Sequence, residues 1–187
     1  MLQTDTDLFL WLNGDGGQFL DNAMTWLSSR WSAIPIYAGL LYLLYKKYAR
    51  ELIKILPAVA LLVLVSDQTS VAVKNLVQRE RPCHAAELSG QVHQVEHKCG
   101  GQFGFYSSHA SNTIGLSVFV GLLLAHRITF VGLLIWTVAV GYSRIYLGVH
   151  YPGDILAGWI SGALIGWVAF KLLRPFLKLN QATAETK

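Results

Sequence analysis

The sequence predicts an all-α protein, a polytopic membrane helix bundle with five to six transmembrane helices and interfacial N-terminal helices. Hydrophobic residues make up 53% of its 187 residues and charged residues only 14%, whereas a soluble domain carries roughly 25% charged residues. The apolar residues occur in separate blocks, each close to the ~20 residues that cross a bilayer. This length and pattern indicate a single membrane-embedded domain over residues 1–187.

Residues 1–22 are expected to lie along the membrane surface. Their apolar runs, such as Leu8–Leu12, are too short to span and are interspersed with aspartates. Gly14, Gly16 and Gly17 are expected to divide the segment into short helices. Five spans then place the N-terminus outside the cell, and a sixth span within residues 1–22 would reverse only that terminus.

Five apolar stretches are predicted to cross the membrane. The first is interrupted by Ser28, Ser29 and Arg30. A polar segment at 79–105 is expected to form an extracytoplasmic loop, and residues 175–187 a cytoplasmic tail. In order, the stretches cover about residues 23–45, 52–74, 107–125, 128–149 and 151–173.

Positive charge predicts the orientation, because cytoplasmic loops of membrane proteins are enriched in lysine and arginine. The richer side of the predicted spans holds Lys46, Lys47, Arg50, Lys54, Arg127, Lys171, Arg174, Lys178 and Lys187. The other side holds Arg30, Lys74, Arg79, Arg81, Lys98 and Arg144. The richer side is therefore expected in the cytoplasm, and the net charge of +4 reflects this anchoring and not nucleic-acid binding.

Three motifs gather on the extracytoplasmic side, each beside the end of an apolar stretch. They are Lys74-x6-Arg81-Pro82, Tyr106-Ser107-Ser108-His109, and Ser143-Arg144-x5-His150-x3-Asp154. Lys74, Arg81 and Arg144 could each anchor a helix at the interface, although such anchors are expected on the cytoplasmic side. As a set near one membrane face, these three cations predict a site that binds an anion such as phosphate.

The two histidines of the motifs are candidates for proton transfer and nucleophilic attack. Asp154 follows His150 by four residues across the start of a predicted helix, so it can hold one imidazole nitrogen and leave the other free to attack phosphorus. The alternative is a structural histidine held by a nearby carboxylate. His109 opens a helix after Ser107 and Ser108, either of which could cap that helix or bind phosphate oxygens.

The motifs resemble the signature of the type 2 phosphatidic-acid phosphatase superfamily, which also includes vanadium haloperoxidases and glucose-6-phosphatase. Its pattern is Lys-x6-Arg-Pro, then Pro-Ser-Gly-His, then Ser-Arg-x5-His-x3-Asp, and the first and third parts are complete here. In the second part Tyr106 replaces the proline and Ser108 replaces the glycine. The added side chain puts the shape of the pocket in doubt more than its chemistry.

The resemblance implies a residue-by-residue assignment of roles. His150 would be the nucleophile that forms a phosphohistidine, Asp154 would orient it, and His109 would be the general acid and later the base. No metal or other cofactor would be used. Phosphate would be bound by Lys74, Arg81, Ser107, Ser108 and Arg144.

The resemblance also implies the substrate class and the location. The protein is expected in the bacterial cytoplasmic (inner) membrane, with its active site facing the periplasm or outside. It would hydrolyse a lipid phosphomonoester or diphosphate, such as undecaprenyl diphosphate, phosphatidylglycerol phosphate, phosphatidic acid or a lipid A phosphate. A phosphotransferase with another acceptor is an alternative, and a non-catalytic lipid-headgroup-binding protein is an alternative of a different class. The latter would need no nucleophile.

The polar loop carries the two cysteines of the chain, Cys83 and Cys99, with His84, His93 and His97 beside them. A zinc site is conceivable from these residue types, but their spacing matches no familiar zinc module. An oxidising compartment favours a disulfide. We therefore expect Cys83 and Cys99 to be joined.

Two features inside the spans have alternative explanations. Gly158, Gly162 and Gly166 recur every four residues, which allows close helix packing, either within the bundle or between two copies of the chain. Asp67 is an intramembrane carboxylate and hence a functional candidate, but it could equally join two helices by a hydrogen bond. Packing within the bundle is the expectation for the glycines.

Overall fold

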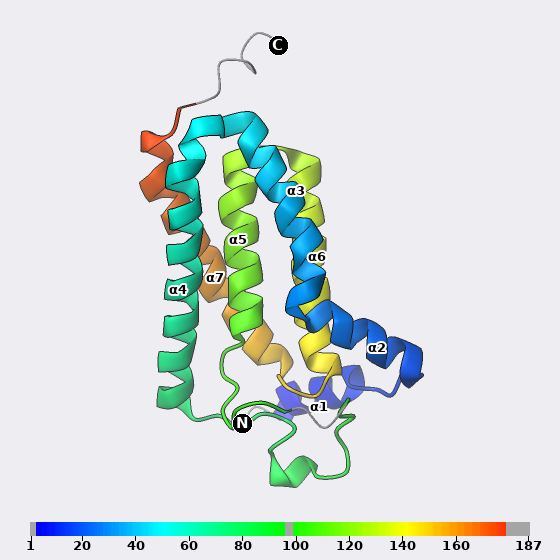
Figure 1. Cartoon of the computed structure of the whole chain (residues 1–187). Helices are drawn as coiled ribbons and strands as arrows, with labels where there is room; N and C mark the ends of the chain where they lie inside the picture. Colours follow the sequence, from blue (N-terminus) through cyan, green and yellow to red (C-terminus); the bar gives the residue numbers. More distant parts are fainter. Residues whose placement is uncertain (1–2, 96–98, 179–187) are drawn as a thin grey trace.

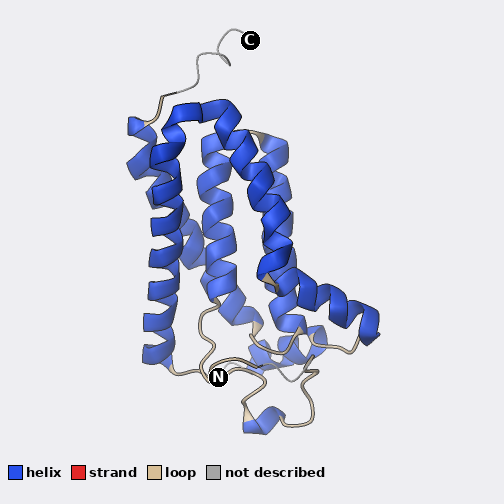
Figure 2. Cartoon of the chain, viewed as in Figure 1, coloured by secondary structure: helices blue, strands red, loops and turns tan. Residues whose placement is uncertain are grey.

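The computed structural model describes residues 3–95 and 99–178, which form seven α-helices and three short 3-10 helices (Figure 1, Figure 2). This confirms the predicted all-α class. His97, Lys98 and the tail residues 179–187 lie outside the described residues. The α-helices are α1 (Gln3–Leu12), α2 (Gly17–Ser28), α3 (Arg30–Tyr48), α4 (Leu52–Val77), α5 (Ser108–Leu124), α6 (Arg127–Tyr146) and α7 (Pro152–Leu173).

Helices α3 to α7 run side by side as a bundle, and α1 and α2 lie at one end of it (Figure 1). We call this end, with α1, α2 and the connections 78–107 and 147–151, the motif end. The opposite end, where the chain reverses at 49–51 and 125–126, is the turn end. All three sequence motifs come together at the motif end.

Among residues 3–95 and 99–178, two helical segments are long and apolar enough to cross a membrane, Arg127–Tyr146 and Pro152–Phe176. Helix α5 is apolar but shorter. Large apolar side chains also point outward from the bundle, for example Ile160 (73% exposed) and Leu61 (60% exposed). An outward apolar surface suits a lipid environment, and the five-span arrangement stays a prediction.

The interruption expected at Ser28–Arg30 in the first predicted span is a break between two helices. Helix α2 continues through Ser28, the backbone of Ser29 is extended, and α3 starts at Arg30, so the stretch 23–45 is not one continuous helix and its span stays a prediction. The hydroxyl of Ser29 donates to the carbonyl of Trp26 at 2.7 Å. Serine hydroxyls that bond nearby carbonyls offer the backbone an alternative to a continuous helix.

The glycines of α7 pack within the bundle, which confirms that expectation. A Cβ atom at Gly158 would lie 2.7 Å from the carbonyl oxygen of Ser107, and one at Gly162 would clash with the carbonyl of Ser111. Gly166 meets the backbone of α5 in the same way. This close approach places the start of α5 beside the start of α7, where the second and third motifs meet.

Candidate active site

The His150–Asp154 pair lies where the chain enters α7. His150 is 2% exposed and Asp154 is fully buried. Nδ1 of His150 lies 3.3 Å from Oδ2 of Asp154, and the same oxygen accepts the backbone N–H of Tyr151 at 3.1 Å. Because Tyr151 is the N-cap and Asp154 the third residue of the helix, the carboxylate also caps α7.

Arg81 reaches the other nitrogen of the His150 ring. Its Nη1 lies 3.0 Å from Nε2. A guanidinium can only donate, so Nε2 accepts and the proton of the neutral ring is on Nδ1, facing Asp154. Burial, followed by the charges of neighbouring cations, holds the pKa of His150 well below its ordinary value. The imidazole is therefore neutral, with its lone pair on Nε2.

Lys74 lies in the last turn of α4 and contacts the second motif. Its Nζ donates to the hydroxyl of Ser70 at 2.6 Å and to that of Ser108 at 2.7 Å. Ser108 is the residue that replaces the glycine of the family pattern. Its hydroxyl thus holds the ammonium group as well as adding bulk to the pocket.

Tyr106, the other departure from the pattern, is buried and bonded on both sides. Its hydroxyl donates to Thr69 at 3.0 Å and accepts from Ser161 at 2.8 Å. Its carbonyl accepts from Ser70 at 3.1 Å. The tyrosine therefore links α4 and α7 just before α5 begins.

Ser107 and His109 occupy different environments at the start of α5. Ser107 is fully buried; its hydroxyl accepts the N–H of Ala110 at 3.4 Å, and its own N–H donates to the Asp154 carbonyl at 3.1 Å. It is thus the serine that caps α5. The side chain of His109 is exposed and lines a cavity with Ser108.

Arg144 lies in the last turn of α6 and is held by α2. Its Nη1 donates to the hydroxyl of Ser28. Its Nε is buried and has no hydrogen-bond partner among residues 3–95 and 99–178. The guanidinium therefore keeps an unused donor in the site. The contact with Ser28 has no sequence signal, because it joins residues separated by 116 positions.

Two cavities, each of about 290 Å³, share Ser28 and Ser29 among their lining residues. One contains Arg81 and Arg144 together with Val149, the residue before His150. The other continues from His109 between α3, α5 and α6, and is lined partly by apolar side chains: Leu27, Ala33, Tyr37, Trp136 and Val140. Both cavities therefore offer charged and apolar side chains, and Ser28 and Ser29 line both of them.

Asp67 lines the second cavity below the site. Its Oδ1 accepts from the side chain of Asn112 at 2.8 Å. This bond joins α4 to α5, so the carboxylate has the interhelical contact that was one of its two explanations.

The loop of the motif end is closed by a disulfide between Cys83 and Cys99, whose Cα atoms are 5.9 Å apart. Sulfurs in this bond are not thiolate ligands for zinc. His84 instead bonds the carbonyl of Gly100, at 3.2 Å.

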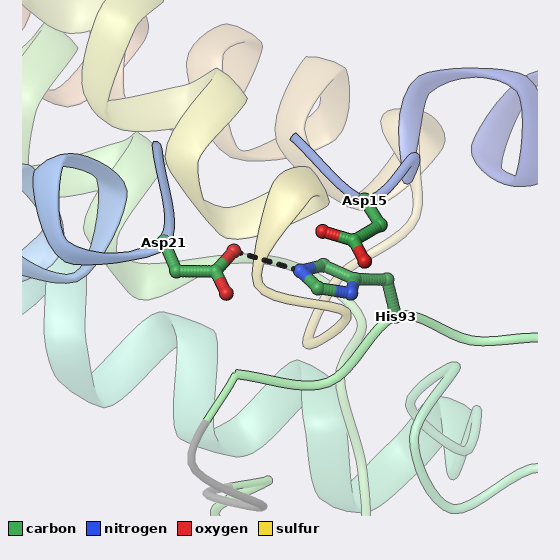
Figure 3. Close-up of side chains that lie close together, drawn as sticks. All are labelled: Asp15, Asp21 and His93. Atoms are coloured by element: carbon green, nitrogen blue, oxygen red, sulfur yellow. Dashed lines mark hydrogen bonds and ion pairs between the residues drawn. The ribbon is translucent and has the colours of Figure 1, made fainter. Parts of the chain in front are cut away.

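A second group of titratable side chains lies outside the site and comprises Asp15, Asp21 and His93 (Figure 3). Nε2 of His93 is 2.8 Å from Oδ1 of Asp21, and the hydroxyl of Tyr146 donates to the same oxygen at 2.7 Å. The hydrogen bond from Tyr146 lowers the pKa of Asp21 most, and the bond to His93 lowers it further. They tie α2 to the loop and to α6, and this accounts for the placement of the group.

Arg79 is the charged residue of the site that sequence reasoning missed, having counted it only toward the orientation. Its Nη1 donates to Oδ1 of Asp154 at 2.9 Å, and its Nη2 to Oδ2 of Asp5 at 2.7 Å. The only sequence signal was a second arginine two positions before Arg81.

The chain is similar to known proteins over most of its length. Residues 37–177 match the model of the PAP2 superfamily. A lipid A 4'-phosphatase of Bacteroides thetaiotaomicron is 35% identical over 169 residues, which cover 89% of this chain and 75% of that protein. The lipid A 4'-phosphatase of Porphyromonas gingivalis is 36% identical over 176 residues, covering 92% and 74%.

Two solved structures share the fold. A transmembrane PAP2-type phosphatidylglycerolphosphate phosphatase of Bacillus subtilis aligns with a TM-score of 0.70 and 19% identity, over 92% of this chain and 85% of that one. Aquifex aeolicus LpxE aligns with a TM-score of 0.68 and 22% identity, over 89% and 94%.

Proposed function

The chain belongs to the PAP2 superfamily of membrane lipid phosphatases, and we propose that it transfers the phosphate of a lipid to His150 and then to water. The observation that carries this proposal is the ring of His150. Its Nδ1 faces Asp154 and its Nε2 accepts from Arg81. A neutral imidazole with its lone pair turned toward cations is oriented to attack an anionic phosphate that those cations bind.

In the first step, Nε2 of His150 attacks phosphorus and the bond to the lipid oxygen breaks. Asp154 stabilises the positive charge that the ring acquires. His109, at the edge of the cavity, gives a proton to the departing alkoxide. The phosphate oxygens are held by Lys74, Arg81, Ser108 and Arg144. Ser107, expected from the sequence as a further ligand, is instead the buried cap of α5.

Arg81 has a second effect, because its guanidinium donates to the lone pair of the nucleophile in the structure. A bound phosphate would attract the guanidinium through two charge-assisted hydrogen bonds. Nε2 of His150 would then be released as the substrate binds.

In the second step, water attacks the phosphohistidine. His109, now without its proton, takes one from the water as the phosphorus–nitrogen bond breaks. Inorganic phosphate leaves and His150 returns to its neutral form. No step needs a metal ion, because organic cations neutralise the phosphate.

For the substrate, we propose a phosphomonoester on a lipid A-type glycolipid. The relatives from Bacteroides thetaiotaomicron and Porphyromonas gingivalis are lipid A 4'-phosphatases, and this chain aligns with about three quarters of the length of each. The two neighbouring cavities suit an amphipathic substrate, with the phosphate beside Arg81 and Arg144 and an apolar part beside Trp136 and Val140. We propose that the motif end faces the periplasm or outside, because lysine and arginine are more numerous toward the turn end and such enrichment is typical of the cytoplasmic face.

Phosphate release from purified protein tests the proposal. The panel contains a lipid A 4'-phosphate, undecaprenyl diphosphate, phosphatidylglycerol phosphate and phosphatidic acid, each assayed with and without a chelator. We expect the lipid A 4'-phosphate to be hydrolysed fastest, and at the same rate in the presence of the chelator. The His150→Ala variant should be inactive. Phosphate found on another lipid instead of in solution would favour a phosphotransferase. Binding without turnover would favour the headgroup-binding alternative.

A further inference from the structure

Helix α1 contacts the catalytic carboxylate through Arg79. We propose that Asp5 and Arg79 are positioning residues, which hold Asp154 so that its second oxygen faces His150. This inference rests on the proposed function, since the step that it affects is the attack by His150. It gives the N-terminal helix, expected only to lie on the membrane surface, a part in catalysis.

The carboxylate of Asp154 divides its contacts between its two oxygens. Oδ2 faces Nδ1 of His150 and accepts the N–H of Tyr151. Oδ1 accepts from Arg79 at 2.9 Å. Asp154 is fully buried, so its charge needs a nearby cation. Arg79 supplies that cation, and the direction of its guanidinium determines how the carboxylate is turned.

Arg79 is itself fixed on several sides. Its second arm donates to Asp5 at 2.7 Å, and its guanidinium carbon lies 3.9 Å above the ring of Tyr151. Its carbonyl accepts the N–H of Gly104 at 2.8 Å. Only 16% of the side chain is exposed. A side chain held in this way has few alternative rotamers, so it can orient Asp154 firmly.

Asp5 connects this ion pair to the first turn of α7. Its Oδ1 accepts the N–H of Gly153 at 2.8 Å, while its Oδ2 holds Arg79. A Cβ atom at Gly153 would lie 2.8 Å from the Asp5 carboxylate, so a glycine is needed for this approach. A carboxylate at a helix N-terminus is also favoured by the helix dipole.

Apolar contacts hold α1 in register with this chain of charges. Phe9 is fully buried, and its ring meets that of Tyr151 edge to face with 5.4 Å between centroids. The ring of Tyr151 thus contacts both the ring of Phe9 and the guanidinium of Arg79. Asp5, Arg79 and Asp154 therefore form one packed unit, with Arg79 between two carboxylates.

The test measures the rate of phosphoenzyme formation by rapid quench, together with KM. Arg79→Gln should lower the rate about 10- to 100-fold, the usual cost of losing a residue that orients a reactive group. KM should stay unchanged, because Arg79 orients Asp154 and does not touch the phosphate. Arg79→Lys should recover part of the rate, since one ammonium can pair with Asp154 but lacks the planar fork.

Asp5→Asn keeps an acceptor for Gly153 and removes only the charge, so it should lower the rate less. The double variant Asp5→Asn/Arg79→Gln should be no slower than Arg79→Gln alone, because Asp5 acts through Arg79. Arg127→Gln, an exposed arginine at the turn end, is the matched control. Thermal unfolding in detergent checks the fold, and if Arg79→Gln does not fold, Arg79→Lys takes its place in the cycle.

The outcomes separate this inference from the proposed function. An active wild type with an unchanged rate in the Arg79 variants would overturn the positioning role, and so would a raised KM with an unchanged rate. Additive losses from Asp5→Asn and Arg79→Gln would overturn the link through Arg79. An inactive wild type on the whole lipid panel would instead overturn the proposed function and remove the basis of this inference.

Discussion

The two ends of the helix bundle use positive charge in opposite ways. At the turn end, Lys54 is 46% exposed and donates to Glu51 and to the carbonyl of Phe176. At the motif end, Arg79 is only 16% exposed and lies between two carboxylates. Exposed cations stay solvated and contribute little, whereas buried ones are costly unless partners hold them. The difference shows that the motif end is built to hold charge for a purpose other than anchoring.

The largest expected effect tests that purpose directly. His150→Ala should abolish the labelled phosphoenzyme and lower turnover on the order of 10⁴-fold or more, because a nucleophile has no substitute. Alkali-stable, acid-labile label, the behaviour of a phosphohistidine, would be measured on the wild type and the variant after reaction with ³²P-labelled lipid, and total label would be measured alongside it. Label that still attaches to His150→Ala would show that another residue is the nucleophile.

Within the motif end, His109 and His150 should differ in their sensitivity to the leaving group. His109→Ala removes proton donation, which typically contributes about 10²–10⁴-fold. A lipid alkoxide needs that proton, and an activated aryl phosphate needs it much less. Rapid-quench rates of the first step should therefore fall far more for the lipid. Equal losses on both substrates would contradict the role of a general acid.

Removing the disulfide should lower the stability of the motif end without changing the rate of the reaction there. Cys83→Ser opens a loop that spans 16 positions, and this should lower the free energy of unfolding by about 3 kcal/mol in the chain-entropy model. The first-step rate should change little at a temperature where the variant is folded, because neither sulfur takes part in the reaction. Thermal unfolding and rapid quench on the same samples measure both quantities.

The low pKa of His150 should also move the acid limb of the pH–rate profile to lower pH. Burial and nearby cations lower the pKa of His150, so Nε2 stays unprotonated as the pH falls through 6.5, the ordinary value for histidine. The first-step rate on an aryl phosphate should hold through that pH and decline only further down. An acid limb at or above 6.5 would mean that the cations do not act on this ring as described.

The smallest expected effect is that of a substitution at the turn end. Lys54→Ala removes an exposed ion pair with Glu51, and such pairs typically contribute about 0.2–1 kcal/mol. Stability should therefore fall by less than about 1 kcal/mol, with turnover unchanged. A marked loss of turnover would remove the contrast between the two ends.

Much of the fold and part of the site follow from local sequence. Apolar blocks mark α4 to α7 within a few residues, because spans need uninterrupted apolar side chains. His150 and Asp154 are close because Asp154 is the third residue of α7 and its side chain turns back to the residues just before the helix, as in a capping box. Ser28, Ser29 and Arg30 marked an interruption before α3, but composition alone does not reveal the hydroxyl bonds to carbonyls that accompany a complete break between two helices there.

By itself, the sequence determined that this is a helical membrane phosphatase with its motif residues at one end. Only the tertiary structure decided how those residues meet. Arg81 contacts His150 across 69 positions, and Arg79 contacts Asp5 across 74. Contacts at such separations depend on how the helices pack and where the loop folds back, and no local pattern of residues encodes the direction in which a charged side chain then points.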